Sequence, residues 1–525
     1  MSSGRARVIS EPLGGSALSQ ALQAGRLPAG LQPWRPQSVD EWRTHAQSVA
    51  RQASRAWYAA LAPALNASDA AKERIERVVR EGGVVVTTGQ QASLFGGPLY
   101  TLAKAVTALE IANEVERELG VAAAPVFWAA TDDADFLEAS IAFVADAHGL
   151  HELRLGAKPP SGTPMSHAPL GDTIALLNEL RVACGSAANA EYLALVERHF
   201  ADARCSVGDA YVALMRSLLE PLGVAVLDSS HAAYSATARP LLTDALRKSA
   251  LIAQASHDRA EEIRKAGFEP QVEDDRGLTL LAVMEKRGKR RVSVEEAPRF
   301  KPHGDDTLAP NVLLRPIVEA AILPTIAYVG GPAELAYFVQ SNAVADVLGR
   351  PPVVGVPRWS GTVVEPFAER ALSRLGAAYH ELRDVAALEK RLAAAAIPPQ
   401  VAHAWASLQE SVHAAILRLR DTVDETQLLP HAVIDGLRNS LDHRLQRGER
   451  RLLAAVKRRE ERIHTDLRVA AAALYPNGER QERVLNYIPM LVRGGATLME
   501  DLRAGARAHA AALLRASRIE SVATR

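Results

Sequence analysis

The chain is poor in cysteine and lacks the short motifs that bind metals or nucleotides in many enzymes. Only Cys184 and Cys205 occur among 525 residues, which excludes a disulfide scaffold and fits a reducing compartment. No C-x-x-C or H-x-x-x-H pair is present, so we predict no metal site. A G-x-x-x-x-G-K-[ST] loop and a G-x-G-x-x-G loop are also missing, so we predict neither a P-loop nor a standard NAD site.

An excess of charge of either sign is missing as well. Lys and Arg together number 61, as do Asp and Glu, so the formal net charge is zero. This balance argues against a chain whose main role is electrostatic binding of nucleic acid. No apolar run approaches the ~18 residues of a membrane span, and the N-terminus has no signal-peptide pattern. We therefore expect a cytoplasmic protein that acts without a membrane or nucleic acid.

What the sequence does contain is the tripeptide Gly-Gly-Pro, twice, each time where a predicted strand meets a predicted helix. The two copies are Gly96-Gly97-Pro98 and Gly330-Gly331-Pro332. Proline suits the first helical position, and glycines ahead of it let a ligand approach the N–H groups of the helix start. In an α/β sheet, strands that end in this way face a ligand crevice. The pattern predicts one site built from two distant segments.

Two βαβ units surround these tripeptides. The first has strands at 83–88 and 125–130 around a helix at 98–119, and the second has strands at 323–329 and 352–356 around a helix at 332–348. Right-handed crossovers make the strands of each unit parallel. We therefore predict an α/β fold with a Rossmann-like, doubly wound core, to which a further buried strand ending at Asp228 also belongs.

The remaining segments predict insertions and an arm around this core. We assign 1–255 to the first part of the core, with a helical insertion at about 150–220, and 311–383 to its second part. Between them, 256–310 forms a small connecting insertion with strands at 272–273 and 278–283. The charged run at 285–291 is interpreted as a hairpin turn with solvated flanks, and contact with phosphate or nucleic acid is the alternative. Residues 384–475 form a helical arm, and 476–525 return to the core as helix.

Apolar residues in the arm repeat every 11 positions. Examples are the series Ile434, Leu445, Val456 and the pair Leu408 and Leu419. Such a period corresponds to about 3.67 residues per turn, as in a straight or slightly right-handed coiled coil. Pro430 interrupts the pattern, so we predict two antiparallel helices joined near 427–430. The second would have about 40 residues and a length of about 60 Å.

Five segments, in order along the chain, resemble the bacillithiol biosynthesis cysteine-adding enzymes, the BshC cysteine ligase family. They are TGQQASLFGGPLYTLAK at 88–104, PVFW at 125–128, PNVLLRP at 310–316, LPTIAYVGGPAE at 323–334 and QER at 481–483. Together they span most of the chain. The resemblance implies a Rossmann-type core, a connecting insertion and an antiparallel coiled-coil arm, with a homodimer as a further expectation.

The resemblance also implies an activity. Members of this family are assigned to the last step of bacillithiol synthesis, in which a carbon–nitrogen ligase joins cysteine to the amine of glucosaminyl-malate. One position departs from the family, which carries Glu-Asp-His-Asp after its Phe-Trp strand. Residues 132–135 here read Asp-Asp-Ala-Asp, so Ala134 replaces the histidine. A divergent member with an altered substrate is therefore left open.

Amide formation from a free carboxylate needs an activated acyl group, an anion site and a neutral amine. We expect ATP, with or without Mg²⁺, to supply the activation, and no tightly bound cofactor. Asp132, Asp133 and Asp135 are the candidate catalytic residues, which could hold an ammonium group, bind Mg²⁺ or accept a proton. The alternative for them is a solvated loop with a helix N-cap. The candidate residues for binding substrate or nucleotide are Gly89, Gln90, Gln91, Gly96, Gly97, Tyr100, Thr101, Lys104, Arg315, Gly330, Gly331, Glu334 and Arg358.

Structural alternatives stand beside several of these assignments. Tyr100 could simply pack and Lys104 could be solvated. Arg315 could clamp malate or phosphate, or could serve as an ion-pair partner. Glu334 lies in a first helical turn, where an acid complements the helix dipole.

Two other functions stay open at this point. One is a nucleotidyltransferase or synthetase-like enzyme that acts on another amino acid. The other is a non-catalytic protein in which the coiled-coil arm binds a partner and the crevice is residual.

Overall fold

The computed structural model describes residues 4–185, 189–273, 275–285, 288–301, 307–459 and 461–515. The chain forms two compact units. The larger, which we call the core unit, contains Arg5–Ala145, His151–Val364 and the segment from Gln481 onward. The smaller, the arm unit, consists mainly of Glu365–Arg480. Residues 365–383, predicted as core, therefore belong to the arm unit.

A five-stranded parallel sheet forms the centre of the core unit. Its order is β11-β10-β2-β3-β6, and each neighbouring pair is parallel. The strands are β2 (Val84–Gln91), β3 (Ala123–Ala130), β6 (Ala225–Asp228), β10 (Thr325–Gly330) and β11 (Gly355–Pro357). Read from β6 to β11, their chain order is 3-2-1-4-5, which is the Rossmann arrangement. The predicted fold class is confirmed.

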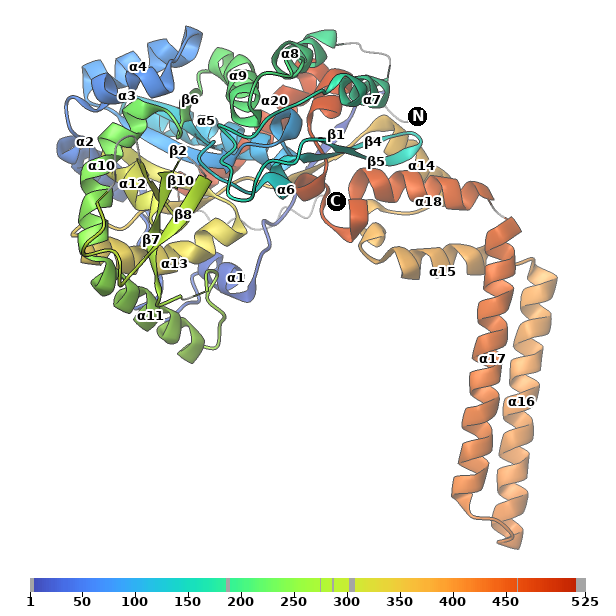
Figure 1. Cartoon of the computed structure of the whole chain (residues 1–525). Coiled ribbons are helices and arrows are strands. Elements are labelled where there is room, and N and C mark those ends of the chain that lie inside the picture. The colour runs from blue at the N-terminus through green and yellow to red at the C-terminus, as the bar shows by residue number, and fades with distance from the viewer. Residues whose placement is uncertain are drawn as a thin grey trace. The chain divides into compact units, whose positions relative to one another are not determined.

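Helices cover both faces of this sheet (Figure 1). Val84 and Val86 of β2 pack with Ile111 of α5 (Leu99–Leu119), while Val85 packs with the cluster that holds Phe338 of α13 (Pro332–Val347). Successive side chains of a strand point to opposite faces, so α5 and α13 lie on opposite sides. The valine run of β2 is buried on both faces, as expected for a central parallel strand.

The other α-helices described in the core unit lie before, between and after the two βαβ units. They are α1 (Ala17–Gln23), α2 (Val39–Gln52), α3 (Trp57–Leu65), α4 (Asp69–Glu81), α6 (Phe136–Ala139), α7 (Ile174–Cys184), α8 (Ala190–Phe200), α9 (Val207–Leu219), α10 (Ala232–Arg247), α11 (Ser249–Lys265), α12 (Arg315–Ile322), α19 (Gln481–Val484) and α20 (Ile488–Leu514). Short strands β1 (Arg7–Ser10) and β12 (Gly361–Val364) pair antiparallel, and β4 (Ile141–Asp146) forms a two-stranded sheet with β5 (Gly149–Arg154).

The connecting insertion is a three-stranded antiparallel sheet of order β8-β7-β9. Its strands are β7 (Leu278–Glu285), β8 (Gly288–Ser293) and β9 (Thr307–Pro310). The strand predicted at 278–283 is confirmed, whereas 272–273 is not a strand. The predicted boundary between 255 and 256 falls inside α11, because that helix continues to Lys265. Part of the charged run, 286–287, lies outside the described residues.

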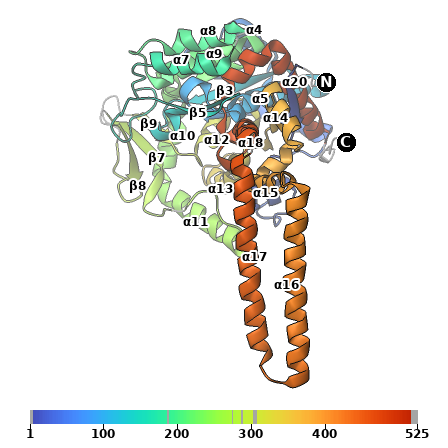
Figure 2. The same cartoon turned by 90° about the vertical axis from the view of Figure 1, so that its right-hand side faces the viewer.

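The arm unit is helical. Figures 1 and 2 show α16 (Pro399–Thr426) and α17 (His431–Arg459) side by side, joined at the predicted turn. Helix is described over α17 (His431–Arg459) and again over α18 (Glu461–Leu474), and residue 460 between them lies outside the described residues. The predicted length of about 40 residues for the second helix therefore stays a prediction. The arm unit also contains α14 (Pro366–Leu375) and α15 (Val385–Ala395).

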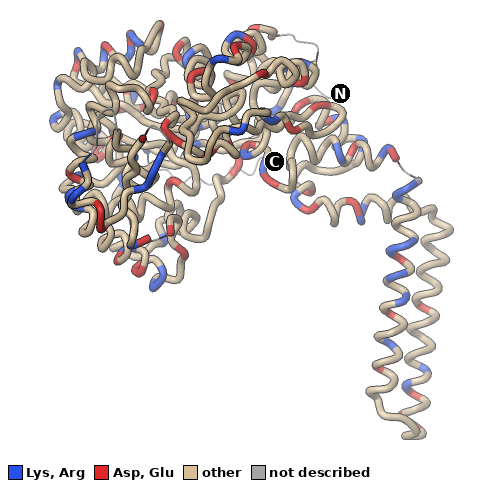
Figure 3. The backbone as a smooth tube through the Cα atoms, in the orientation of Figure 1, with Lys and Arg blue, Asp and Glu red and all other residues tan. Residues whose placement is uncertain are grey.

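The apolar seam of this hairpin agrees with the predicted repeat in part. Ile416, Val423 and Ile434 form a buried cluster, while Leu408 and Leu419 are 46% and 39% exposed. Leu408 and Leu419 therefore do not lie in the seam. Charges of both signs are distributed along the two helices (Figure 3), as expected for helices that meet solvent. The predicted homodimer stays a prediction.

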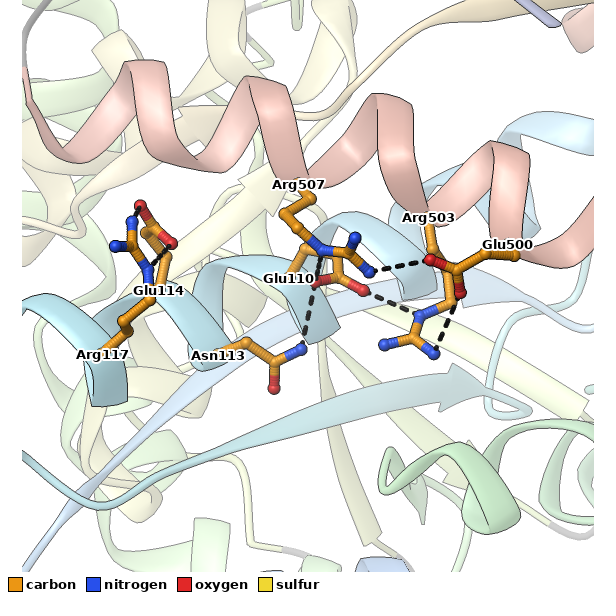
Figure 4. Close-up of polar contacts among 7 residues, drawn as sticks. All are labelled: Glu110, Asn113, Glu114, Arg117, Glu500, Arg503 and Arg507. Atoms are coloured by element: carbon orange, nitrogen blue, oxygen red, sulfur yellow. Dashed lines mark hydrogen bonds and ion pairs between the residues drawn. The ribbon is translucent and has the colours of Figure 1, made fainter.

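The C-terminal helix α20 is tied to α5 by a buried carboxylate (Figure 4). Glu110 on α5 is 1% exposed and accepts hydrogen bonds from Arg503 Nε at 2.8 Å, Arg507 Nε at 3.3 Å and Asn113 Nδ2 at 3.1 Å. Glu500 contacts both arginines from the solvent side. This network holds the helical return predicted at 476–525 against the first Gly-Gly-Pro helix.

No helix among the described residues is both long enough and apolar enough to span a membrane.

The Glu110 network predicts an unequal response to two alanine substitutions. Glu110→Ala leaves Arg503 and Arg507 without their buried acceptor, and we expect it to lower the free energy of unfolding by about 2 kcal/mol. Glu500→Ala removes an exposed partner of the same arginines and should cost less than about 1 kcal/mol. Urea denaturation followed by tryptophan fluorescence measures both, since five of the six tryptophans lie in the core unit. Equal losses would contradict the buried role of Glu110.

Candidate active site

The two Gly-Gly-Pro helices are joined by a buried ion pair. Lys104 on α5 lies 2.6 Å from Glu334 on α13, and its side chain is 5% exposed. Its ammonium group also donates to the Gly89 carbonyl at 2.8 Å and to Gln90 Oε1 at 3.0 Å. Three acceptors thus surround the three N–H bonds of Lys104. The alternative of a solvated lysine is wrong, and burial lowers its pKa although Glu334 acts in the opposite direction.

The Glu334 carboxylate also has partners besides Lys104. It accepts hydrogen bonds from the Gly331 N–H at 2.7 Å and from the Tyr328 hydroxyl at 3.0 Å. Glu334 thereby caps the start of its own helix, as the structural alternative for this residue proposes. Gly330 contributes its carbonyl oxygen to the Arg358 N–H at 2.9 Å.

Further contacts connect the residues around this ion pair to Tyr100, Arg358 and Glu482. Gln90 donates to the Tyr100 hydroxyl at 3.0 Å, and burial raises the pKa of Tyr100. The Arg358 guanidinium lies 5.8 Å from the Tyr100 ring centre and forms two hydrogen bonds with Glu482, at 2.7 and 2.9 Å. Arg358 is 3% exposed. The structure therefore assigns Arg358 to a buried ion pair with the predicted QER segment.

The first Gly-Gly-Pro turn is closed by the C-terminal segment. Gly96 and Gly97 have φ values of 88° and 85°, which only glycine adopts readily. A Cβ atom on Gly96 would lie 2.2 Å from the Tyr487 hydroxyl. The Asn486 amide donates to the carbonyl oxygens of Phe95 and Gly97, at 2.9 and 3.0 Å.

The backbone donors of this turn are also in use. The N–H groups of Gly96 and Gly97 donate to Ser93 and Leu94, and the Leu99 N–H donates to Leu485. The prediction of an open anion cradle here is not supported, because these N–H groups have partners within the chain. The segment predicted as a loop from residue 89 begins as strand, because β2 continues through Gly89, Gln90 and Gln91. Pro98 is the N-cap of α5. Thr101, in the first turn of that helix, is fully buried.

The predicted acids occupy three different environments. Asp132 is 6% exposed and accepts a hydrogen bond from Ser229 Oγ at 2.5 Å. Lys289 of β8 lies with its Nζ 3.2 Å from the Asp132 carbonyl and 3.7 Å from its carboxylate. Burial by itself raises the pKa of Asp132, but the charges of Lys289 and Arg315 and the Ser229 hydrogen bond bring it below its usual value.

Asp133 and Arg315 form a longer ion pair, 3.9 Å between Oδ2 and the guanidinium. Although burial opposes the charged form, Asp132 and Asp133 raise the pKa of Arg315. Asp135 differs from both, because it is exposed and its carboxylate caps α6 by accepting from the Glu138 N–H at 3.2 Å. The N-cap alternative therefore describes Asp135. Ala134 lies between them and donates its N–H to Asp133 Oδ1 at 2.7 Å.

A cavity of about 410 Å³ opens beside these groups. Its charged lining residues are the cations Lys289, Arg291 and Arg315 and the acids Asp133, Glu273 and Asp275. Apolar lining residues come from α11, β7 and the segment after β9, and they include Ile252, Leu280 and Val312. Of the predicted site residues, Asp133 and Arg315 line this cavity, while the Lys104–Glu334 group does not. Lys289 was missed as a site residue. Its only signal was the charged run at 285–291, which the sequence places in a solvated turn.

The described residues do not bring three or more His, Cys, Asp or Glu side chains close enough together to hold a metal ion. The fold and the site define a Rossmann-like α/β protein with a cavity that is lined by charged side chains, among them Asp133 after β3. Residues 33–358 match the N-terminal Rossmann-like domain of the bacillithiol biosynthesis protein BshC, and 361–511 match the BshC C-terminal coiled-coil domain. The chain belongs to the BshC family.

Curated relatives agree with this assignment. Proteins named "Putative cysteine ligase BshC" from Solibacter usitatus and Koribacter versatilis are each 29% identical to this chain, over 459 and 456 residues. The alignments cover 84% and 83% of this chain and 86% and 84% of the relatives. A protein of the same name from Geobacillus kaustophilus is also 29% identical, over 84% of this chain and 85% of its own length. These names agree with the ligase class predicted from the sequence.

The buried position of the Lys104–Glu334 pair predicts a large effect of removing one partner. Lys104→Met leaves the Glu334 carboxylate without its cation, and we expect a loss of about 3–5 kcal/mol in the free energy of unfolding. The double variant Lys104→Met/Glu334→Gln should recover part of this loss. Lys72→Met serves as the control, because Lys72 and Glu76 form an exposed pair worth less than about 1 kcal/mol. A loss for Lys104→Met no larger than the control in urea denaturation would show that the pair is not required.

Proposed function

We propose that the protein catalyses the addition of cysteine to the amine of glucosaminyl-malate, the last step of bacillithiol biosynthesis. The observation that carries this proposal is the lining of the cavity, in which the cations Lys289, Arg291 and Arg315 occur together with the acids Asp133, Glu273 and Asp275. A substrate with both an amine and carboxylates needs groups of both signs within one site. Family membership supplies the reaction, and the cavity supplies groups that suit its amine substrate.

The chemistry divides between the two kinds of group. Arg315 and Lys289 suit the carboxylates of the malate moiety, since an arginine can hold a carboxylate through two parallel hydrogen bonds. Asp133 would accept a proton from the substrate ammonium group, which leaves a neutral nitrogen able to attack. The C–N bond then forms at the cysteine carboxyl carbon, and the activated carboxyl oxygen departs with the group that it carries. This leaving group accepts the second proton that the nitrogen loses as the amide forms.

We further propose ATP as the co-substrate that activates the cysteine carboxylate by transfer of a phosphoryl or adenylyl group. The described cations that line the cavity are Lys289, Arg291 and Arg315. Because Lys289 and Arg315 are assigned to the malate carboxylates, Arg291 is the residue that would hold the ATP phosphates. In the first Gly-Gly-Pro turn, by contrast, the N–H groups of Gly96, Gly97 and Leu99 already have partners in the chain. The geometry therefore favours side-chain cations over this turn as the phosphate ligands.

A second candidate is a synthetase-like enzyme that acts on another amino acid. It is favoured by Ala134, which stands where the family resemblance calls for a histidine. Ala134 offers only its backbone to the site, and its N–H is taken by Asp133. Any contact that an imidazole makes with the substrate at this position is therefore lost here.

The proposal predicts product formation and two distinct kinetic defects. Purified protein with cysteine, glucosaminyl-malate and ATP should yield the thiol product detected by mass spectrometry. Asp133→Asn removes the proton acceptor and should lower kcat/KM about 100-fold. Arg315→Met removes a charged hydrogen-bond donor and should raise KM for glucosaminyl-malate about 10- to 100-fold.

Matched controls come from the exposed pair Asp202 and Arg204, which are 2.9 Å apart. Asp202→Asn and Arg204→Met should leave both kinetic parameters unchanged. Wild-type kinetics for Asp133→Asn and Arg315→Met would rule out this site. Product formed from another amino acid but not from cysteine would establish the second candidate. No product with any amino acid would favour a non-catalytic protein.

A further inference from the structure

Glu319 is a buried acid that the proposed reaction leaves without a role. It lies on α12, one helical turn after Arg315, and is 1% exposed. Neither of its carboxyl oxygens has a hydrogen-bond partner among the described residues. A buried carboxylate without partners is far more costly than a neutral carboxylic acid in the same place.

The charges around Glu319 are already paired with one another. Lys104 is held by Glu334 at 2.6 Å, and Arg315 faces Asp132 and Asp133. Two cations, two acids and three tyrosines act on Glu319 from the elements around it. They are Arg315 of α12, Lys104 of α5, Glu334 of α13, Asp132 after β3, Tyr337 of α13, Tyr234 of α10 and Tyr328 of β10. A negative charge on Glu319 would therefore compete for cations that other carboxylates hold.

Glu319 is coupled by charge to both ionic groups described above. It interacts electrostatically with Lys104 and Glu334 at the switch point of the sheet, and with Arg315 and Asp132 beside the cavity. Burial, opposed in part by Arg315, raises the pKa of Glu319 to about 8. The carboxyl group is therefore mostly protonated at neutral pH.

We propose that Glu319 is a positioning residue, held as a neutral carboxylic acid in the folded protein so that Arg315 keeps its charge for a carboxylate in the cavity. In this form Glu319 fills its place on α12 without drawing the guanidinium away from the cavity. When Glu319 ionises at higher pH, it becomes a competitor for Arg315, and the affinity for an anionic ligand falls. The identity of that ligand rests on the proposed function, whereas the neutrality of Glu319 does not.

The neutral state is tested by stability against pH, without any assay of activity. An unfolded glutamate has a pKa of about 4.3, so between about pH 4 and 8 the folded protein binds a proton that the unfolded chain has lost. The stability linked to this proton is fully present below about pH 4 and is lost as the pH rises through 8. Glu319→Gln cannot ionise and does not lose this stability. The melting temperature of the variant minus that of the wild type should therefore increase from pH 5 to 8 and stay constant above pH 8.

Glu73→Gln provides the matched control, since Glu73 is an exposed glutamate of α4. Its difference from the wild type should not widen toward pH 8. A Glu319→Gln difference that is constant with pH would overturn the proposal. In wild-type protein carrying ¹³C in its glutamate carboxyl groups, one resonance should titrate near pH 8, and the absence of any resonance titrating above pH 7 would overturn it without a variant.

The positioning role is tested by titrating L-malate, the dicarboxylate part of the proposed substrate, into each protein by calorimetry. For the wild type we expect malate to bind at least threefold more weakly at pH 9 than at pH 7. Glu319→Gln should bind it equally at both pH values. Equal pH dependence in the two proteins would overturn the positioning role. Failure of malate to bind the wild type at pH 7 would instead count against the proposed substrate and leave the stability test to decide on Glu319.

Discussion

The ion pair between Lys104 and Glu334 is the interaction on which the core of this protein depends. It joins the helices that follow β2 and β10, the adjacent strands at which the sheet reverses its order. In many Rossmann-like proteins this position is a ligand crevice. Here the ammonium group is surrounded by Glu334, Gly89 and Gln90. The two βαβ halves are thus held together by charge at the place where a ligand would otherwise separate them.

This arrangement directs ligand binding toward β3 and the inserted sheet. Lys289 reaches Asp132 from β8, and Arg315 faces Asp133 from the start of α12. The cavity beside them is therefore lined by side chains from the Rossmann-like core and from the insertion. Its lining includes charges of both signs, which suits a substrate with an amine and carboxylates. In our proposal, Glu319 stays a neutral acid and leaves the charge of both cations available.

Much of the fold could be predicted, because local patterns specify it. The valine run at 84–86, the two Gly-Gly-Pro turns and the buried strand before Asp132 have the period and the punctuation of βαβ units. The hairpin turn near Pro430 was predictable for the same reason. The seam of the arm was predictable only in part, since Leu408 and Leu419 fit the 11-residue repeat but lie on an exposed face. Periodicity does not say which face meets a partner helix.

The sequence alone determined the Rossmann-like core, because βαβ patterns are local, and the family, because five segments carry its motifs. It also named Asp133 and Arg315 as candidate site residues, but the fold brings them together, since Arg315 follows the antiparallel strand β9. Only the tertiary structure decided that Lys104, Glu334 and Arg358 bind other residues of the chain, that Asp135 caps a helix, that Lys289 lines the cavity and that Glu319 is buried. The contacts of Lys104, Glu334, Arg358 and Lys289 are with partners more than a hundred positions away in the chain. Glu319 depends on burial, and the cap made by Asp135 is local. A side chain's charge is visible in the sequence, but whether it meets a ligand or another side chain depends on which segments fold against it.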